Sequence, residues 1–160
     1  FLKQYPNLLI VNAFTKFYAM AGLRLGYLMT GDLSLLHAVA QQLPEWNVSS
    51  IAQRAGISAL QDTEYEKRTR QLIEKERRYL IQEFLKMGCT VFPSEADYIT
   101  FRLPQEKTGF LLKERLLEGK ILIRSCANYR NMPPDCYRIA VKQHADNEEL
   151  VRQVWRILKQ

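Results

Sequence analysis

The residues best suited to chemistry lie in one short segment near the start of the chain. Lys16 follows an apolar run, and Phe14, Phe17, Tyr18 and Met20 are its neighbours in the sequence. Desolvation among such side chains favours the neutral amine, which is the nucleophile that forms a Schiff base with an aldehyde. The alternative is a surface lysine that extends its amine into water.

A hydroxyl and a guanidinium accompany this lysine. Thr15 precedes Lys16, and Arg24 follows it eight residues later, after a glycine. The glycine permits a turn that returns Arg24 to the same pocket. A hydroxyl and a guanidinium together are typical phosphate ligands. The segment therefore predicts a lysine nucleophile beside a phosphate site.

A strand on each side must position this segment. Residues 8–11 form an uninterrupted apolar run that predicts a buried strand, and residues 25–29 predict a second one. We interpret them as strands of a parallel sheet. Because two parallel strands cannot bury both faces, further strands are expected upstream. We therefore expect this chain to be the C-terminal part of a larger protein.

Three helices follow, over residues 33–42, 48–60 and 63–87. Asp62 is the predicted N-cap of the third helix, and Gly88 is its C-terminal stop. At about 1.5 Å per residue, this helix is long enough to connect two domains.

The rest of the sequence alternates short strands and helices. Strands are predicted at residues 89–92, 98–103, 121–124 and 137–141, and helices at 108–118 and 146–158. The last helix opens with a capping box formed by Asp146 and Glu149. The fold class is α/β, with residues 1–61 ending a larger domain and residues 62–160 forming a small α+β domain.

Composition excludes several classes of protein. The chain is 47% hydrophobic and 25% charged, which is typical of a globular protein. It has neither an apolar run of about 18 residues nor a signal-peptide pattern, so we expect no membrane span, and its three cysteines without a pairing pattern favour the reducing cytoplasm. Cys89, Cys126 and Cys136 lack the spacing of metal ligands, so they are predicted to be buried free thiols, and no metal site is expected.

The net charge of +6 raises the question of an anionic partner. Acidic and basic residues alternate over residues 62–86, which favours a solvated helix face over a nucleic-acid interface. The basic surplus falls later, between Lys107 and Arg130, where it suits a small anionic ligand. A basic interaction fragment without catalysis is the alternative reading of the charge.

The lysine segment also resembles a known family. Thr15-Lys16 followed by Ala21-Gly22-Leu23-Arg24-x-Gly26-Tyr27 is similar to the cofactor-lysine segment of fold-type I pyridoxal-phosphate enzymes, in the class I/II aminotransferase family. The resemblance covers the whole chain. It implies the aspartate aminotransferase-like fold: the end of a large-domain sheet, a connecting helix and a small C-terminal domain. It also implies that Lys16 links covalently to pyridoxal 5′-phosphate and that Thr15 and Arg24 bind the cofactor phosphate.

Within the family, the later stretches resemble two branches. Residues 119–129 and 137–142 are similar to threonine-phosphate decarboxylases of cobalamin biosynthesis, whereas residues 93–98 resemble histidinol-phosphate aminotransferases. The resemblance implies that Arg138 holds the substrate α-carboxylate and that Arg124 and Asn128 lie near its distal phosphate. Purely structural alternatives are an edge-strand arginine for Arg138 and a surface charge for Arg124.

The resemblance thus implies a small anionic amino-acid substrate. The favoured activity is a pyridoxal-phosphate-dependent decarboxylase, and the alternative is a histidinol-phosphate-type aminotransferase. Members of the family are typically homodimers.

Three residues depart from the family pattern. Ala13 stands where relatives carry a hydroxyl, and Ser125 stands where an acid is frequent after Arg124. Ala21 replaces a proline that is common in the decarboxylases, a feature closer to the aminotransferases. In the family, the acid beside the pyridine nitrogen, the ring-stacking aromatic and the asparagine near the ring oxygen lie upstream. We therefore expect the isolated 160-residue chain to be nearly inactive.

Overall fold

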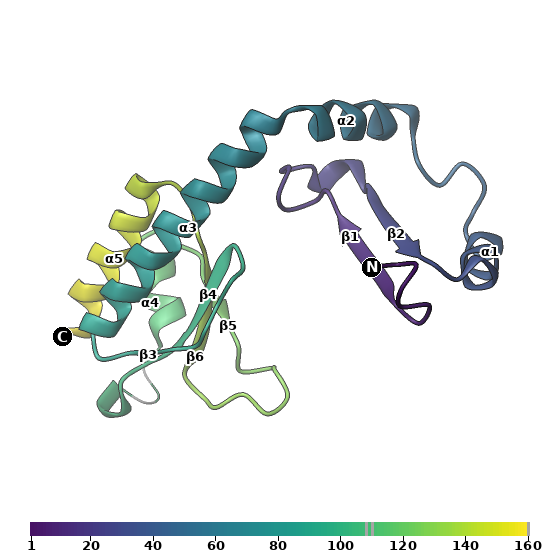
Figure 1. The fold of residues 1–160 in the computed structure, drawn as a ribbon. Coiled ribbons are helices and arrows are strands. Elements are labelled where there is room, and N and C mark those ends of the chain that lie inside the picture. Colours follow the sequence, from purple (N-terminus) through teal and green to yellow (C-terminus); the bar gives the residue numbers. More distant parts are fainter. Residues whose placement is uncertain (108, 110, 160) are drawn as a thin grey trace. The chain divides into compact units, whose positions relative to one another are not determined.

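The computed structural model describes residues 1–107, 109 and 111–159. The chain divides into two compact units, Phe1–Lys67 (unit 1) and Arg68–Gln160 (unit 2). The division falls inside the long helix α3, Thr63–Lys86 (Figure 1). The predicted domain boundary after residue 61 stays a prediction, and each unit is described by itself.

Unit 1 contains a pair of strands followed by helices. Its elements are β1 (Leu9–Ala13), the 3₁₀ helix η1 (Ala21–Leu23), β2 (Gly26–Thr30), α1 (Leu33–Gln41), α2 (Ser50–Gln61) and the first turn of α3. Side-chain caps begin both complete helices: Asp32 accepts hydrogen bonds from two amides of α1, and Ser49 accepts one from Ala52. The helices predicted over residues 33–42 and 48–60 are confirmed to within two residues.

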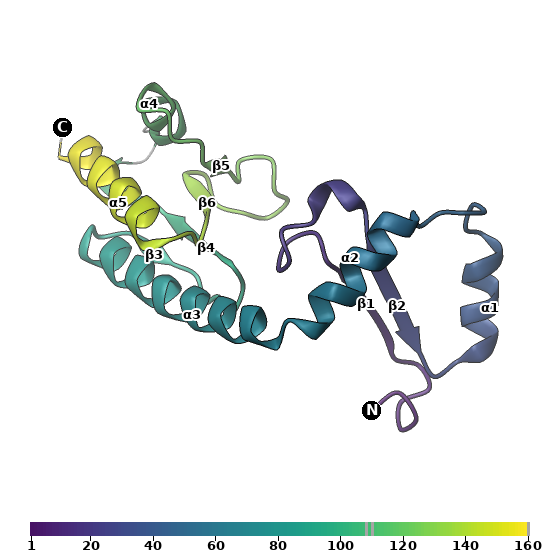
Figure 2. The same cartoon turned by 90° about the horizontal axis from the view of Figure 1, so that it is seen from above.

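The strands β1 and β2 pair antiparallel, with Leu9 opposite Thr30 and Ala13 opposite Gly26 (Figure 2). The expected parallel arrangement is therefore wrong. Parallel neighbours need a crossover connection, usually a helix, whereas residues 14–25 turn the chain straight back. The expected burial of the first strand is also wrong, because Val11 is 71% exposed. A single pair of strands cannot cover both of its own faces.

Unit 2 is a four-stranded sheet packed against helices. Its elements are the remainder of α3, β3 (Thr90–Val91), β4 (Tyr98–Arg102), the 3₁₀ helix η2 (Gln105–Lys107), α4 (Leu112–Glu118), β5 (Arg124–Ser125), β6 (Cys136–Ala140) and α5 (His144–Leu158). The strand order is β3-β4-β6-β5, and all neighbours are antiparallel.

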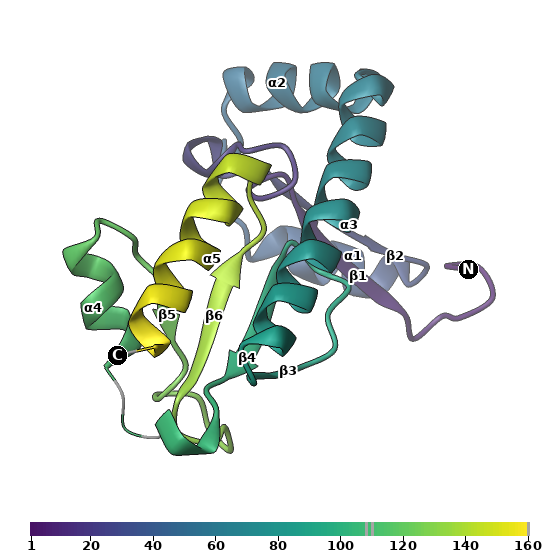
Figure 3. The same cartoon turned by 90° about the vertical axis from the view of Figure 1, so that its left-hand side faces the viewer.

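One face of this sheet carries the core. Helices α3 and α5 lie along that face (Figure 3). Phe84 of α3 meets Phe101 of β4 with ring centroids 4.3 Å apart, and Val154 of α5 is fully buried in the same cluster. Successive side chains of a strand point to opposite faces of the sheet. Arg138 lies between the core residues Tyr137 and Ile139 of β6, so it is on the opposite face. This opposite face carries Arg138 and its strand partner Thr100.

The ends of α3 agree with the sequence. The Asp62 carboxylate accepts a hydrogen bond from the Tyr65 amide at 2.8 Å, which confirms the predicted N-cap. At the other end, Gly88 adopts a φ of +79°, the left-handed conformation that favours glycine after a helix.

Two predicted elements near α4 differ in extent. The helix predicted over residues 108–118 begins at Leu112 in the structure, and Thr108 lies outside the described residues. The strand predicted at 121–124 is reduced to Arg124–Ser125. Its first residue is unavailable for pairing, because the Ile121 amide donates to the Leu116 carbonyl and closes the C-terminus of α4.

The last helix begins at His144 rather than Asp146, so the predicted capping box is wrong. Asn147 supplies the hydrogen bonds instead: its amide group accepts from the Lys142 backbone N–H and donates to the Lys142 carbonyl. Glu149 pairs within the helix, with Arg152 and Gln153.

The three cysteines are buried and free, as predicted. Burial raises the pKa of the Cys89 thiol to about 12, so this thiol stays protonated and unreactive near neutral pH. Across the described part of the chain, no helix has the length and apolar character that a bilayer span requires.

Candidate active site

Lys16 lies in a tight turn just beyond β1. The Ala19 amide donates to the Lys16 carbonyl at 3.0 Å, and Ala19 itself adopts a φ of +53°. This turn forces the chain to reverse before η1. The lysine backbone is thus fixed by a local hydrogen bond.

The turn is anchored on its N-terminal side by Phe14. The Phe14 side chain is 5% exposed, and its amide donates to the Leu25 carbonyl at 3.1 Å. Helix α2 packs here through Gly56, where an added Cβ would lie only 2.5 Å from the Leu25 side chain. Glycine at this position therefore permits the close approach of α2 to the loop.

Tyr65 anchors the turn on its C-terminal side. Its hydroxyl donates to the Phe17 carbonyl at 2.9 Å. Its ring stacks on Tyr18, with centroids 6.0 Å apart, and meets the edge of Phe17 at 6.2 Å. Sequence reasoning missed Tyr65, because nothing in the spacing links a helix residue to a loop 48 residues earlier.

The expectation that Lys16 is desolvated is wrong, because its side chain is exposed in the structure. The aromatic neighbours pack on α2 and on Tyr65 and do not cover the amine. Within the part of the chain that the structure describes, no acceptor or acid pairs with the Lys16 amine. The amine is therefore accessible to a ligand.

Thr15 and Arg24 lie in the same loop between β1 and β2. Thr15 is half-buried, and Arg24 is exposed at a left-handed φ of +53°. The Arg24 guanidinium donates to the Ala21 carbonyl at 3.3 Å, and no acid among the described residues neutralises it. A hydroxyl, an unneutralised guanidinium and an unpaired amine form a donor set that fits a phosphate-bearing aldehyde.

Asn12 and Tyr27 join the strands at the base of this loop. The Asn12 side-chain amide donates to the Tyr27 hydroxyl at 3.1 Å, and its side-chain oxygen Oδ1 accepts from the Ala13 backbone amide. Gly26 lies beside this pair, where an added Cβ would be 2.9 Å from the Asn12 carbonyl oxygen. These bonds fix where the loop leaves the sheet.

In unit 2, the structure brings Arg138, Arg124 and Asn128 together. Arg124 lies directly opposite Arg138 on neighbouring strands, and its guanidinium donates to Asn128 at 3.3 Å. Like charges in opposite positions of an antiparallel pair repel each other. Since no acid of the described residues forms an ion pair with either arginine, an anionic ligand would relieve that repulsion.

Aromatic rings flank both guanidinium groups. The Arg138 guanidinium lies 4.8 Å from the centre of the Tyr98 ring, and that of Arg124 lies 5.9 Å from the Tyr129 ring. Such contacts orient a cation without neutralising it. Sequence reasoning missed the contact of Tyr98 with Arg138, because it depends on the pairing of β4 with β6 that places Thr100 opposite Arg138.

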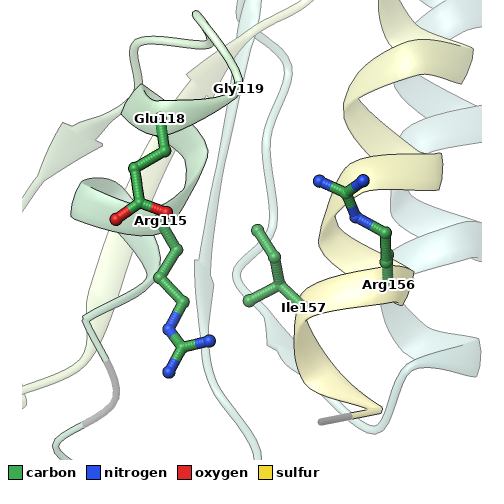
Figure 4. Close-up of a pocket in the computed structure, with 5 residues that line it drawn as sticks. All are labelled: Arg115, Glu118, Gly119, Arg156 and Ile157. Atoms are coloured by element: carbon green, nitrogen blue, oxygen red, sulfur yellow. The ribbon is translucent and has the colours of Figure 1, made fainter.

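A separate pocket lies between α4 and α5 (Figure 4). Its lining residues are Arg115, Glu118, Gly119, Arg156 and Ile157. None of the predicted site residues lines it. Its mixed charges therefore form no part of the candidate active site.

Comparison with known proteins identifies the family. Residues 1–154 match the aminotransferase class I and II family, and the chain belongs to this family. This confirms the predicted relationship and the aspartate aminotransferase-like fold. Pyridoxal 5′-phosphate is the cofactor of the family, as the resemblance implied.

Two curated relatives differ in their reactions. The chain is 36% identical over 158 residues to threonine-phosphate decarboxylase of Salmonella typhimurium, covering 98% of this chain and 43% of the relative. It is 33% identical over 160 residues to histidinol-phosphate aminotransferase of Oleidesulfovibrio alaskensis, covering 99% of this chain and 41% of that relative. The chain thus spans about two fifths of the length of these relatives.

A solved structure is similar throughout. Histidinol-phosphate aminotransferase from Clostridium acetobutylicum superposes with a TM-score of 0.93 at 32% identity, covering 99% of this chain and 48% of the other. The two activities thus occur among relatives of nearly equal similarity.

Proposed function

We propose that this chain carries the cofactor lysine and the substrate-binding arginines of a pyridoxal-phosphate-dependent decarboxylase that acts on threonine phosphate. The observation that carries the proposal is the unpaired Lys16 amine, in a turn fixed on both sides and in one loop with Thr15 and Arg24. The 36% identity to the Salmonella typhimurium decarboxylase supports the choice of reaction.

The residues of unit 1 would hold the cofactor. Lys16 would bind it covalently through Nζ, while the Thr15 hydroxyl and the Arg24 guanidinium would donate hydrogen bonds to its phosphate. When bound, pyridoxal phosphate supplies an electron sink for negative charge at the substrate α-carbon. The free Lys16 amine can then accept or return a proton at that carbon.

The residues of unit 2 would orient the substrate. Arg138 would bind the α-carboxylate, and Arg124 with Asn128 would bind the distal phosphate. How Arg138 orients the carboxylate decides which bond to the α-carbon breaks. By holding the carboxylate, Arg138 would determine which group leaves the α-carbon: CO₂, or a proton that Lys16 would accept.

A histidinol-phosphate-type aminotransferase is the second candidate function. Two observations favour it: Ala21 in place of the proline common in the decarboxylases, and the similarity to the Clostridium acetobutylicum aminotransferase. Both candidates use the same lysine and the same arginines, so they differ mainly in the orientation of the substrate.

Substrate assays on the full-length protein, loaded with pyridoxal phosphate, distinguish the candidates. We expect CO₂ release from O-phospho-L-threonine. Formation of glutamate that depends on 2-oxoglutarate and histidinol phosphate, without CO₂ release, would instead establish the aminotransferase. Failure of both assays, together with DNA binding that weakens steeply with salt, would favour the non-catalytic basic fragment.

We also propose that the complete protein is a cytoplasmic homodimer and that the isolated 160-residue chain is nearly inactive. The acid beside the pyridine nitrogen is expected upstream of this segment, so the isolated chain would lack it. Light scattering on the full-length protein measures the mass of the assembly. Robust turnover by the isolated chain would contradict the second proposal.

A further inference from the structure

Tyr65 is the residue through which helix α3 contacts the lysine turn. It lies in the first turn of α3, and its own amide donates to the N-cap Asp62 at 2.8 Å. The capped turn therefore fixes the backbone of Tyr65 before its side chain reaches the loop. Its half-buried ring is further held by Phe17 and Tyr18.

The hydrogen bond from Tyr65 falls on a sensitive atom. Its acceptor, the Phe17 carbonyl, belongs to the residue directly after Lys16. The carbonyl of Lys16 itself is taken by the Ala19 amide. Two consecutive carbonyls of the turn are thus occupied, one by the turn and one by α3, and together they restrict rotation of the backbone that carries the amine.

We propose that Tyr65 is a positioning residue for Lys16: its hydroxyl holds the Phe17 carbonyl and thereby fixes the direction in which the Lys16 side chain leaves the turn. This inference rests on the proposed function, in which Lys16 binds the cofactor. It assigns Tyr65 no contact with cofactor or substrate. Its effect passes entirely through the backbone of the turn.

Tyr65→Phe tests the proposal, because it removes the hydroxyl and keeps the ring that packs on Tyr18. Tyr79→Phe is the matched control: the residue lies on the same helix, is also half-buried, and its hydroxyl has no hydrogen-bond partner among the described residues. Both variants are made in the full-length protein, and thermal unfolding establishes that each folds.

Two measurements separate positioning from general destabilisation. The first is hydrogen exchange of the Ala19 amide in the cofactor-free protein, which reports on the turn directly. The second is the dissociation constant of pyridoxal phosphate, determined by equilibrium dialysis. In Tyr65→Phe we expect exchange to accelerate and cofactor binding to weaken by roughly threefold to tenfold, the range of one net hydrogen bond. In Tyr79→Phe we expect neither change.

Unchanged Ala19 exchange in Tyr65→Phe would overturn the proposal, and so would equal acceleration in both variants. Faster exchange with unchanged cofactor affinity would also overturn it, since the turn would then move without consequence for the cofactor. Borohydride reduction of the wild type tests the proposed function separately. If no cofactor is trapped on Lys16, the proposed function and the positioning role both fail, even where exchange shows that Tyr65 holds the turn.

Discussion

The two units of the chain are stabilised in different ways. Unit 2 has its own continuous apolar core, which α3, α4, α5 and one face of the sheet enclose. In unit 1, the buried apolar side chains among the described residues are only Phe14 and Ala52. Its strands remain exposed, with Leu9 and Val11 among the open side chains.

The two units therefore depend on different kinds of interaction for their stability. Unit 2 derives its order from burial, which is distributed over many side chains. The lysine turn of unit 1 depends on a few directional contacts: the Phe14 anchor, the Ala19 hydrogen bond and the Tyr65 hydroxyl. Substitutions in the apolar core of unit 2 should therefore alter stability, whereas those in the lysine turn should alter chemistry.

The largest expected effect is on chemistry, from Lys16→Ala in the full-length protein. Removal of the amine should abolish covalent attachment of pyridoxal phosphate and lower activity by roughly three orders of magnitude or more. Mass spectrometry after borohydride reduction measures the attachment. Lys3→Ala, an exposed lysine of the same unit, is the control and should behave as wild type. A cofactor adduct that persists in Lys16→Ala would place the nucleophile elsewhere.

The next effect is on stability, from Phe84→Ala in the core of unit 2. Loss of this fully buried ring should reduce the free energy of unfolding by about 3–5 kcal/mol, because a cavity remains beside Phe101. Val11→Ala, which is 71% exposed, is the contrasting substitution and should change it by less than about 0.5 kcal/mol. Urea unfolding measures both. Equal losses would show that the units do not differ as described.

A smaller effect is expected on substrate binding, from Arg138→Ala. Loss of a charged hydrogen-bond donor should raise the KM for the amino acid by roughly tenfold to a hundredfold, with a smaller change in kcat. Arg130→Ala, an exposed arginine of the same unit, is the matched control. Steady-state kinetics over a range of substrate concentrations separates the change in KM from the change in kcat. A fall in kcat alone would assign Arg138 to a step after binding.

The smallest effect concerns pH and the buried Glu76 of α3. Burial raises its pKa, but hydrogen bonds from Asn147 and His144 and the charge of His144 outweigh burial, so the pKa lies below its ordinary value of 4.5. A lowered pKa in the folded state stabilises the fold above that ordinary value, and this contribution is lost as pH falls through the lowered pKa.

Urea unfolding of the wild type, followed downward from about pH 6, should therefore show a loss of stability that Glu76→Gln lacks. Glu74→Gln, on the same helix but exposed, should retain the wild-type dependence. If Glu76→Gln follows the wild-type curve, another carboxylate causes the acid sensitivity.

Much of the fold could be predicted because its signals are local. Asp62 and Gly88 mark the ends of α3 through their own backbone preferences, and the apolar alternation of β4 and β6 is visible in a few residues. Lys16 could be proposed as the cofactor lysine because Thr15, Lys16 and Arg24 lie close together in a segment that resembles the family motif.

The features that escaped prediction depend on contacts between distant residues. The direction of β2 relative to β1 is decided by how residues 14–25 turn, which apolar patterning does not encode. The exposure of Lys16 follows from the aromatic rings packing on Tyr65 and α2, and the start of α5 follows from Asn147 reaching back to Lys142. Each of these requires knowledge of the tertiary partner.

The backbone conformation of Arg24 sets the thermal stability of this loop against its positive charge. It adopts a left-handed backbone that glycine occupies freely, and a side chain there costs about 1 kcal/mol. Replacement by glycine would make the loop more robust to heat but would remove the guanidinium. A screen for thermal stability alone would thus select against Arg24, which with Lys16 supplies the positive charge of this loop.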